Sequence, residues 1–205
     1  METIRDLNVV IIPDDWFSVK LINWSRLVSA KYKTNFTLER GKYYPHISLY
    51  QTRYPQKNFA RINSQVEKIA AAFTPFQISL NGFSKNWGFI FYDVEPNEVL
   101  QRLHESIVDA LNPLRNNFIP DSQLRLTGLT AKQKNSIEKY GHVFVKKTYV
   151  PHLSITNLVN PPEISKAMSI LPKKTIKFNV TGLSLGSVSE YGTCPKIFKK
   201  FPFKR

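Results

Sequence analysis

The chain has 205 residues, of which 42% are hydrophobic and 13% aromatic, so it can bury a packed core, and we expect one domain over residues 1–205. A charged fraction of 21% argues against a disordered chain. Its 29 Lys and Arg outnumber 15 Asp and Glu, which leaves a formal net charge of +14 and a pI near 9.9. This surplus favours an anionic partner, and nucleic acid, a nucleotide and an anionic membrane all fit it.

Cysteine usage and the first residues bear on the compartment. The single cysteine, Cys194, excludes an internal disulfide and a cysteine-based zinc site, and a reducing compartment suits it best. The apolar run at residues 9–12 is too short for a signal peptide core or a membrane span. We therefore expect a soluble, cytoplasmic protein.

The first half of the chain alternates strand and helix patterns. A short β-branched run predicts a buried strand over residues 7–12, and apolar residues at helical spacing predict a helix over 15–32. A strand follows at 47–50 and a helix at 58–73. Two strands are expected at 76–83 and 87–94, joined by a turn at 84–86, and then a helix at 97–111.

The second half repeats this theme more loosely. Residues 112–122 contain Pro113 and Pro120 and are expected to form a loop that marks a boundary or crossover. Predicted strands follow at 124–129, 143–147, 149–156, 176–185 and 196–201, with helices at 131–140 and 161–171. The basic run KIFKKFPFKR at the C-terminus fits an edge strand with lysines in water, or else a contact to a phosphate backbone. Helices mixed with hairpin-connected strands predict an α+β fold.

One short pattern occurs twice, about half the chain apart. Residues 44–49 read YPHISL and residues 150–155 read VPHLSI. Because alternate side chains on a strand face the same way, His46 and Ser48 should project together, and so should His152 and Ser154. The aliphatic residues between them then point into the core. The two copies together would present two imidazoles and two hydroxyls on one surface.

This set of groups suits a phosphodiester. One imidazole takes a proton from the attacking oxygen while the other gives a proton to the leaving oxygen, and an ordinary imidazole pKa near ~6.5 allows both roles. The two serines can donate hydrogen bonds to the non-bridging phosphate oxygens. Neither a cofactor nor a metal is required. Which histidine is base and which is acid stays open, because the roles depend on how the substrate lies.

The paired PHIS and PHLS segments resemble the two H-x-[T/S] motifs of the two-histidine (2H) phosphoesterase superfamily, which includes 2′-5′ RNA ligase-like proteins and cyclic phosphodiesterases. The resemblance implies a bilobal α+β fold, in which two pseudo-symmetric lobes of antiparallel sheet with flanking helices surround a central cleft. It also implies the roles given above for His46, His152, Ser48 and Ser154. Both motifs carry serine where many members carry threonine, so the hydroxyls lose the methyl group that restricts their rotamers.

The expected activity is a metal-independent phosphodiesterase acting on 2′-5′-linked or 2′,3′-cyclic phosphodiesters of nucleotides or RNA. Its partner would be RNA, an oligonucleotide or a cyclic nucleotide, with no membrane and no obligate protein partner. Two alternatives remain: a non-catalytic RNA- or nucleotide-binding module of the same fold, and a 2′-5′ RNA ligase.

Several further side chains outside the two motifs are candidates for the site or for packing. Base stacking is assigned to three aromatic residues: Tyr44, Tyr149 and Trp87. Of the two remaining histidines, His104 is expected to flank an apolar helix stripe. His142 is expected to lie in a turn, from which it could reach a site. Arg53 is expected on the solvated surface, and the first-helix tryptophans, Trp16 and Trp24, are expected to pack.

Overall fold

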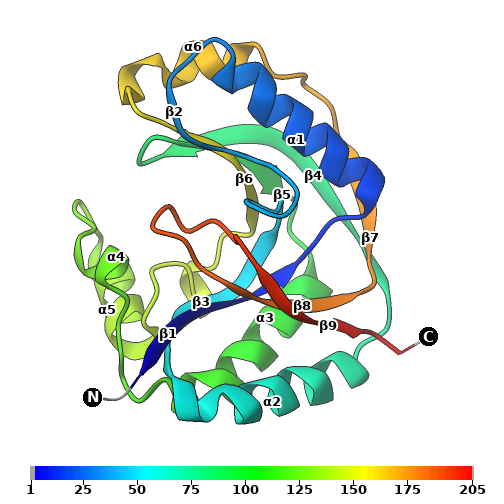
Figure 1. Ribbon diagram of the computed structural model, residues 1–205, viewed down its shortest axis with the longest axis vertical. Helices are drawn as coiled ribbons and strands as arrows, with labels where there is room; N and C mark the ends of the chain where they lie inside the picture. The colour runs from blue at the N-terminus through cyan, green and yellow to red at the C-terminus, as the bar shows by residue number, and fades with distance from the viewer. Residues whose placement is uncertain (1–2, 205) are drawn as a thin grey trace.

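The strands of the protein form one curled antiparallel sheet (Figure 1). The computed structural model describes residues 3–204, and within them the strand order is β7-β4-β5-β6-β3-β1-β8-β9, with β2 pairing with β6. The strands are β1 Ile4–Ile11, β2 Thr34–Thr37, β3 Ile47–Pro55, β4 Phe76–Asn86, β5 Phe89–Val94, β6 His152–Leu158, β7 Ile176–Val180, β8 Gly182–Ser187 and β9 Ile197–Pro202.

Six α-helices accompany the sheet in the described part of the chain: α1 Asp15–Ser29, α2 Phe59–Ala71, α3 Glu98–Leu111, α4 Asp121–Leu124, α5 Ala131–Tyr140 and α6 Ile164–Ser169. Side-chain caps fix where the longest begin. The Asp14 carboxylate accepts from the Phe17 amide at 2.8 Å, and the Asn97 side chain accepts from the Leu100 amide at 2.9 Å. None of the described helices is long and apolar enough to cross a lipid bilayer. The predicted α+β class is confirmed.

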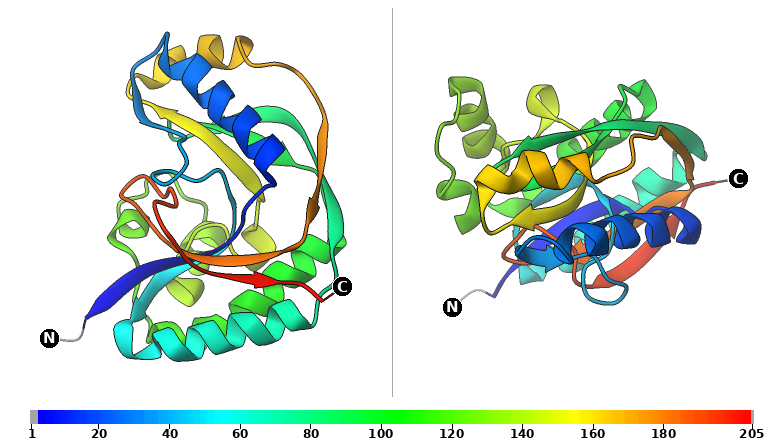
Figure 2. Two further views of the ribbon diagram at one scale, coloured as in Figure 1. Left: turned by 45° about the vertical axis from the view of Figure 1, so that its right-hand side comes forward. Right: turned by 90° about the horizontal axis from the view of Figure 1, so that it is seen from above.

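The sheet has two halves, and each carries its own helices. The half made of β7, β4, β5, β6 and β2 packs with α1 and α6, while the half made of β3, β1, β8 and β9 packs with α2 and α3. Figure 2 shows the two halves from two further sides. The bilobal architecture is therefore as expected.

The lobes are interleaved along the chain, however. β1 and β3 belong with β8 and β9, whereas β6 belongs with β4 and β5. Residues 112–122, which were expected to form a loop at a boundary or crossover, connect α3 to α4 and begin as a short 3-10 helix, Asn112–Arg115.

Apolar stripes on the helices seal the core against the sheet. On α2 the buried residues are Ile62, Val66 and Ala70, which recur every four positions and so form one face. Burying one such aliphatic side chain contributes about 1.5–3 kcal/mol. The helices thus cover one face of the sheet and leave its other face uncovered by these apolar stripes.

Two predicted strands are absent. In the first, Leu124 ends the short helix α4 and residues 125–129 continue as turn and coil. Residues 143–146 alternate buried and half-buried side chains as a strand would, with Val143 and Val145 buried. Their backbone groups bond to side chains instead of a neighbouring strand: the Val143 amide donates to Gln123 Oε1 at 2.9 Å and the Lys146 amide to His104 Nε2 at 2.7 Å.

The last predicted strands also change. The single strand expected at 176–185 is two strands, β7 and β8, which lie in different halves of the sheet and divide at Thr181. The short strand β2 had no prediction. The C-terminal edge strand is confirmed, since β9 pairs with β8 alone and ends the strand order. Trp24 packs against Phe83 and Tyr92 as expected, whereas Trp16 is 60% exposed, so its predicted packing role is wrong.

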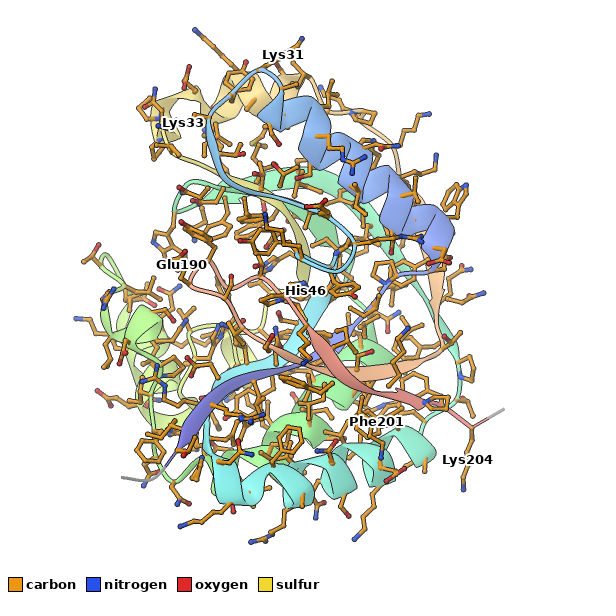
Figure 3. The ribbon with its side chains drawn as sticks, in the orientation of Figure 1. Lys31, Lys33, His46, Glu190, Phe201 and Lys204 are labelled. Carbon is orange, nitrogen blue, oxygen red and sulfur yellow. The ribbon has the colours of Figure 1, made fainter. Side chains whose placement is uncertain are left out.

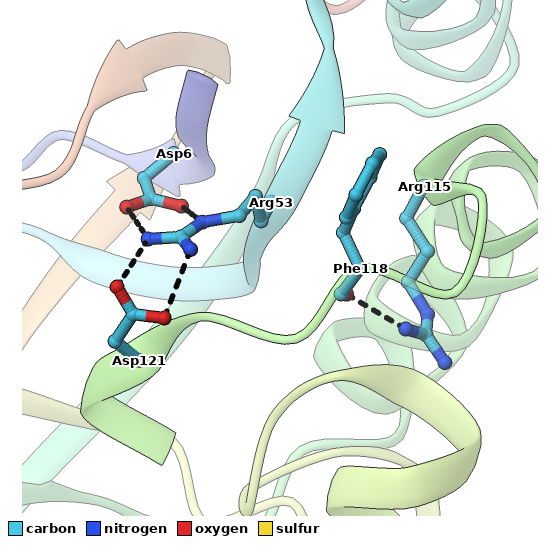
Figure 4. Close-up of polar contacts among 5 residues, drawn as sticks. All are labelled: Asp6, Arg53, Arg115, Phe118 and Asp121. Atoms are coloured by element: carbon cyan, nitrogen blue, oxygen red, sulfur yellow. Dashed lines mark hydrogen bonds and ion pairs between the residues drawn. The ribbon is translucent and has the colours of Figure 1, made fainter. Parts of the chain in front are cut away.

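Arg53 is an ion-pair residue and not a solvated surface cation, which corrects the expectation for it (Figure 4). Its guanidinium donates to Asp6 at 2.8 Å and to Asp121 at 3.1 Å, and so joins β1, β3 and the start of α4. Nearby, the buried Arg115 donates to the Phe118 carbonyl at 2.7 Å. Both arginines hold the segment around residues 115–121 in place.

Candidate active site

The two repeated motifs meet where the halves of the sheet join. β3 and β6 pair antiparallel through Ile47 and Leu153, both fully buried. Continuing this register by one residue on each side sets His46 opposite Ser154 and Ser48 opposite His152. Since alternate residues face opposite ways, these four side chains lie on the face away from the core.

One cavity of about 310 Å³ is lined by all four motif side chains. This volume is at the lower end of the ~300–1,000 Å³ typical of small-molecule sites. Figure 3 shows His46 near the centre of the molecule. The structure therefore brings together His46, Ser48, His152 and Ser154, which the sequence separates into two distant pairs.

The two histidines share one local geometry. His46 Nδ1 lies 2.8 Å from the Tyr44 carbonyl oxygen, and His152 Nδ1 lies 2.7 Å from the Val150 carbonyl oxygen. A carbonyl only accepts, so both Nδ1 atoms donate and carry the ring proton in the neutral state. In each ring Nε2 is left with its lone pair, ready to take up a proton or, once protonated, to donate one.

Burial shifts the protonation of both rings. His46 is 7% exposed, and burial lowers its pKa, against which the bond to the Tyr44 carbonyl acts. His152 is half-buried, with its ring centre 4.0 Å from that of Phe91 and 5.8 Å from that of Phe144. Burial, assisted by the charge of His46, lowers the pKa of His152 to about 4. Both rings are therefore mainly neutral at pH 7 before an anion binds.

The Ser48 hydroxyl is held by residues far from it in sequence. Asn8 Nδ2 donates to Ser48 Oγ at 2.7 Å, so the hydroxyl hydrogen of Ser48 remains available for a phosphate oxygen. The Tyr149 hydroxyl donates to the Ser48 carbonyl at 3.0 Å. Ser154 has no hydrogen bond of its side chain to another described residue, and its hydroxyl opens on the cavity.

The candidate stacking residues occupy different places. Trp87 lines the cavity, is 38% exposed, and lies 5.9 Å from the Phe144 ring. Tyr149 also lines it, but its ring stacks on His104 at 3.7 Å. Tyr44 is not brought to this cavity and lines a separate depression near the start of α1.

His104 is a fully buried residue whose two nitrogens are both satisfied. Nδ1 donates to the Leu49 carbonyl at 2.6 Å, and Nε2 accepts from the Lys146 amide at 2.7 Å. Burial lowers its pKa to about 4, although the bond to Leu49 acts against this shift. It braces the first motif strand from the core side.

Sequence reasoning missed two features of the site. Asn8 lies in a predicted strand, and no pattern marked it as a partner of Ser48. Phe91 and Phe144 form an apolar wall, but their hydrophobic character signalled only core. His142, for which the sequence left both a turn position and a place in the site open, follows the end of α5 and lines the cavity.

The charge of the cavity differs from that of the whole chain. None of its described lining residues is lysine or arginine, and Glu190, on the loop between β8 and β9, carries the one carboxylate there. Figure 3 places Lys31, Lys33 and Lys204 at the periphery of the molecule. Across residues 3–204, no group of three or more His, Cys, Asp or Glu side chains is arranged to hold a metal ion.

The comparisons with known proteins concern the family and the fold. The family model of the 2′-5′ RNA ligase superfamily matches residues 23–191. The protein named Putative phosphoesterase GK0864, from Geobacillus kaustophilus, is 32% identical over 79 residues, which are 37% of this chain and 46% of that protein. The match therefore spans about half the length of this curated relative.

Solved structures show the same fold at low sequence identity. TT0787 of Thermus thermophilus superposes with a TM-score of 0.59 at 15% identity, covering 97% of both chains. E. coli LigT in complex with phosphate superposes with a TM-score of 0.57 at 10% identity, covering 100% of both chains. LigT has also been solved with 3′-AMP and with ATP.

The sheet brings one His-x-Ser pair from the start of β3 and one from β6 to a shared cavity, as the fold of the two-histidine phosphoesterase superfamily implies. The family model covers well over half of the chain, and so the chain belongs to the 2′-5′ RNA ligase superfamily.

Proposed function

We propose that the protein is a phosphodiesterase that cleaves 2′-5′-linked or 2′,3′-cyclic phosphodiesters of nucleotides or RNA, with His46 and His152 as general acid and base. The observation that carries the proposal is the matched pair of Nδ1–carbonyl bonds, which leaves both Nε2 atoms to one cavity. The phosphate and nucleotides bound to LigT, a protein of the same fold, are ligands of the class proposed here.

The proposed step needs one neutral and one protonated imidazole. The Nε2 lone pair of the first takes the proton of the attacking oxygen, which is a neighbouring ribose hydroxyl or a water, as the new P–O bond forms. The bond to the leaving oxygen breaks, and the second imidazole gives that oxygen its proton. The acidic partner gains its proton when the phosphate anion binds beside it, because a nearby negative charge favours imidazolium.

In this proposal the two serines stabilise the negative charge that develops on the phosphate oxygens. Ser48, braced by Asn8, donates to one non-bridging oxygen and Ser154 to another. The pairing of Ile47 with Leu153 supports this role, because it sets each serine opposite the histidine of the other motif. Side chains supply both proton transfers, so this mechanism calls for no metal ion.

The test is a panel of dinucleotides and cyclic nucleotides incubated with the protein in excess EDTA. It includes adenylyl-2′,5′-adenosine, its 3′,5′ isomer and adenosine 2′,3′-cyclic phosphate, with products separated by mass. We expect turnover of the 2′-5′ or cyclic compounds that EDTA leaves unchanged. Loss of turnover with EDTA would overturn the mechanism. Nucleotide binding without cleavage of any compound would select a binding module of the same fold.

A further inference from the structure

A third imidazole enters the cavity and has no part in the two-histidine step. His142 follows Gly141, which ends α5 in the left-handed conformation at φ +73°. The ring of His142 is half-buried and lines the same cavity as His46 and His152. Its role depends on whether the ring nitrogen that faces the cavity carries a proton.

The backbone fixes the tautomer of His142. The Phe144 amide donates to His142 Nδ1 at 3.2 Å, so Nδ1 carries the lone pair and the ring proton is on Nε2. This is the reverse of His46 and His152, whose Nδ1 atoms carry the proton. Among residues 3–204, none accepts a hydrogen bond from His142 Nε2, which leaves this N–H to the cavity.

His142 also stays neutral. To become imidazolium it would have to protonate Nδ1 and so lose the Phe144 amide. Burial lowers its pKa to about 3, and the titratable groups that face it, His152 and His104, act in the same direction. It is therefore a hydrogen-bond donor across the working pH range and neither an acid nor a base.

The turn that carries the ring is held on several sides. Ser136 Oγ donates to the His142 carbonyl at 3.0 Å. The next residue, Val143, makes two such bonds. The Val143 amide donates to Gln123 Oε1 at 2.9 Å, and Thr148 Oγ1 donates to the Val143 carbonyl at 2.7 Å. A donor fixed in this way needs no reorganisation when charge develops on a substrate.

We propose that His142 binds the substrate phosphate, with its Nε2–H donating to a non-bridging oxygen on the side of His152. The described cavity lining offers no lysine or arginine for this purpose, so a neutral imidazole takes the place that a cation would hold. The proposal rests on the proposed phosphodiesterase activity. It names a phosphate-binding residue outside the two His-x-Ser motifs.

Three substitutions of His142 distinguish the contribution of its Nε2–H donor from that of the ring. His142→Phe keeps a ring without nitrogen atoms, and His142→Ala removes the ring. His142→Gln retains a donor near the position of Nε2. We expect kcat for adenylyl-2′,5′-adenosine to fall about 100-fold in the Phe and Ala variants, with a smaller change in KM. The Gln variant should recover most of this loss.

A matched control lies a few residues further along the chain, in the 3-10 helix Lys146–Thr148. Lys147 is exposed and does not line the cavity, so Lys147→Ala should keep wild-type kcat. Melting temperatures of all variants show whether each has folded. A folded His142→Phe protein with kcat within twofold of wild type would overturn the proposal, and so would a Gln variant as slow as the Phe variant.

A binding measurement keeps this inference separate from the activity itself. Titration calorimetry with adenosine 2′-monophosphate should show about tenfold weaker binding by His142→Phe and near wild-type binding by His142→Gln. If the wild-type protein cleaves nothing, the proposed activity fails, and the calorimetry alone decides the role of His142. Equal affinity in wild type and His142→Phe would then reject it.

Discussion

The two motif copies share their local structure and differ in what supports them. His46 and His152 each bond through Nδ1 to the carbonyl two residues earlier. The first copy is braced by hydrogen bonds, with Asn8 on the Ser48 hydroxyl and Tyr149 on the Ser48 carbonyl. The second copy is instead walled by aromatic rings. The repeated sequence thus gives both histidines the same tautomer. The contacts that support each copy come from residues distant in sequence and differ between the two.

The strongest challenge to this comparison is to remove each imidazole in turn. Because both rings transfer a proton in the same step, His46→Ala and His152→Ala should each lower kcat by about 10³-fold, within the usual range for general acid–base groups. Initial rates on adenylyl-2′,5′-adenosine measure the loss, and circular dichroism verifies folding. Activity retained in one of the two variants would show that the copies are not equivalent partners.

The serines should be similar in catalysis and different in stability. Ser48→Ala and Ser154→Ala should each lower kcat by about 100-fold, since each removes one donor to the phosphate. Ser48→Ala also removes the closer of the two acceptors of the buried Asn8 amide, whose other bond, to Gln51 Oε1, is long at 3.4 Å. An N–H left unpaired in this way costs about 1–3 kcal/mol of unfolding free energy. Urea denaturation should show no such cost for Ser154→Ala. Equal stability of the two variants would contradict the conclusion that hydrogen bonds support the first copy and not the second.

Because His104 contacts the first motif strand, its titration should make the stability of the folded protein depend on pH. Its pKa in the folded protein, about 4, lies below the ordinary value of 6.5, so the unfolded chain binds its proton more readily. This contribution to stability is complete above pH 6.5 and is lost as the pH falls toward 4, by about 3 kcal/mol in all.

Unfolding free energies at pH 7 and pH 4.5 measure this effect. The difference between the two pH values should be smaller in His104→Gln, which no longer titrates, than in the wild type. An identical pH dependence in both proteins would mean that His104 is not held neutral by its buried contacts with Leu49 and Lys146.

The smallest expected effect concerns Asn8. Asn8→Asp keeps the shape of the side chain but cannot donate to Ser48 Oγ, and its carboxylate would compete for the Ser48 hydrogen. We expect kcat to fall about tenfold, with KM changed less, because a positioned donor is lost. Asn160 is exposed and does not line the cavity, so Asn160→Asp is a control of the same chemistry that should leave kcat unchanged. An unchanged kcat in Asn8→Asp would remove the hydrogen-bonded brace from the account.

Much of the site was accessible from sequence because its chemistry is local. A His-x-Ser pair on a strand fixes which side chains face together, so His46 with Ser48 and His152 with Ser154 follow from period-two alternation. The meeting of the two pairs rests on a single residue pair, Ile47 with Leu153, between strands about half the chain apart. The repeat and its resemblance to a family pointed to that meeting, whereas strand periodicity alone does not encode it.

The failures have a common cause in non-local contacts. Residues 143–147 carry strand-like alternation, yet their amides bond to Gln123 and His104 and form the turn that holds His142. The division of β7 from β8 arises because the chain passes between lobes at Thr181. In both cases tertiary partners, which no local pattern reveals, override the strand pattern.

The most direct test of the account is ¹⁵N NMR of the histidine rings at neutral pH, since the chemistry depends on which nitrogen of each ring carries the proton. We predict that His46 and His152 carry it on Nδ1, with a bare Nε2, and that His142 carries it on Nε2. A proton on Nε2 of neutral His46 or His152 would contradict the central claim that both rings offer a free Nε2 to the cavity.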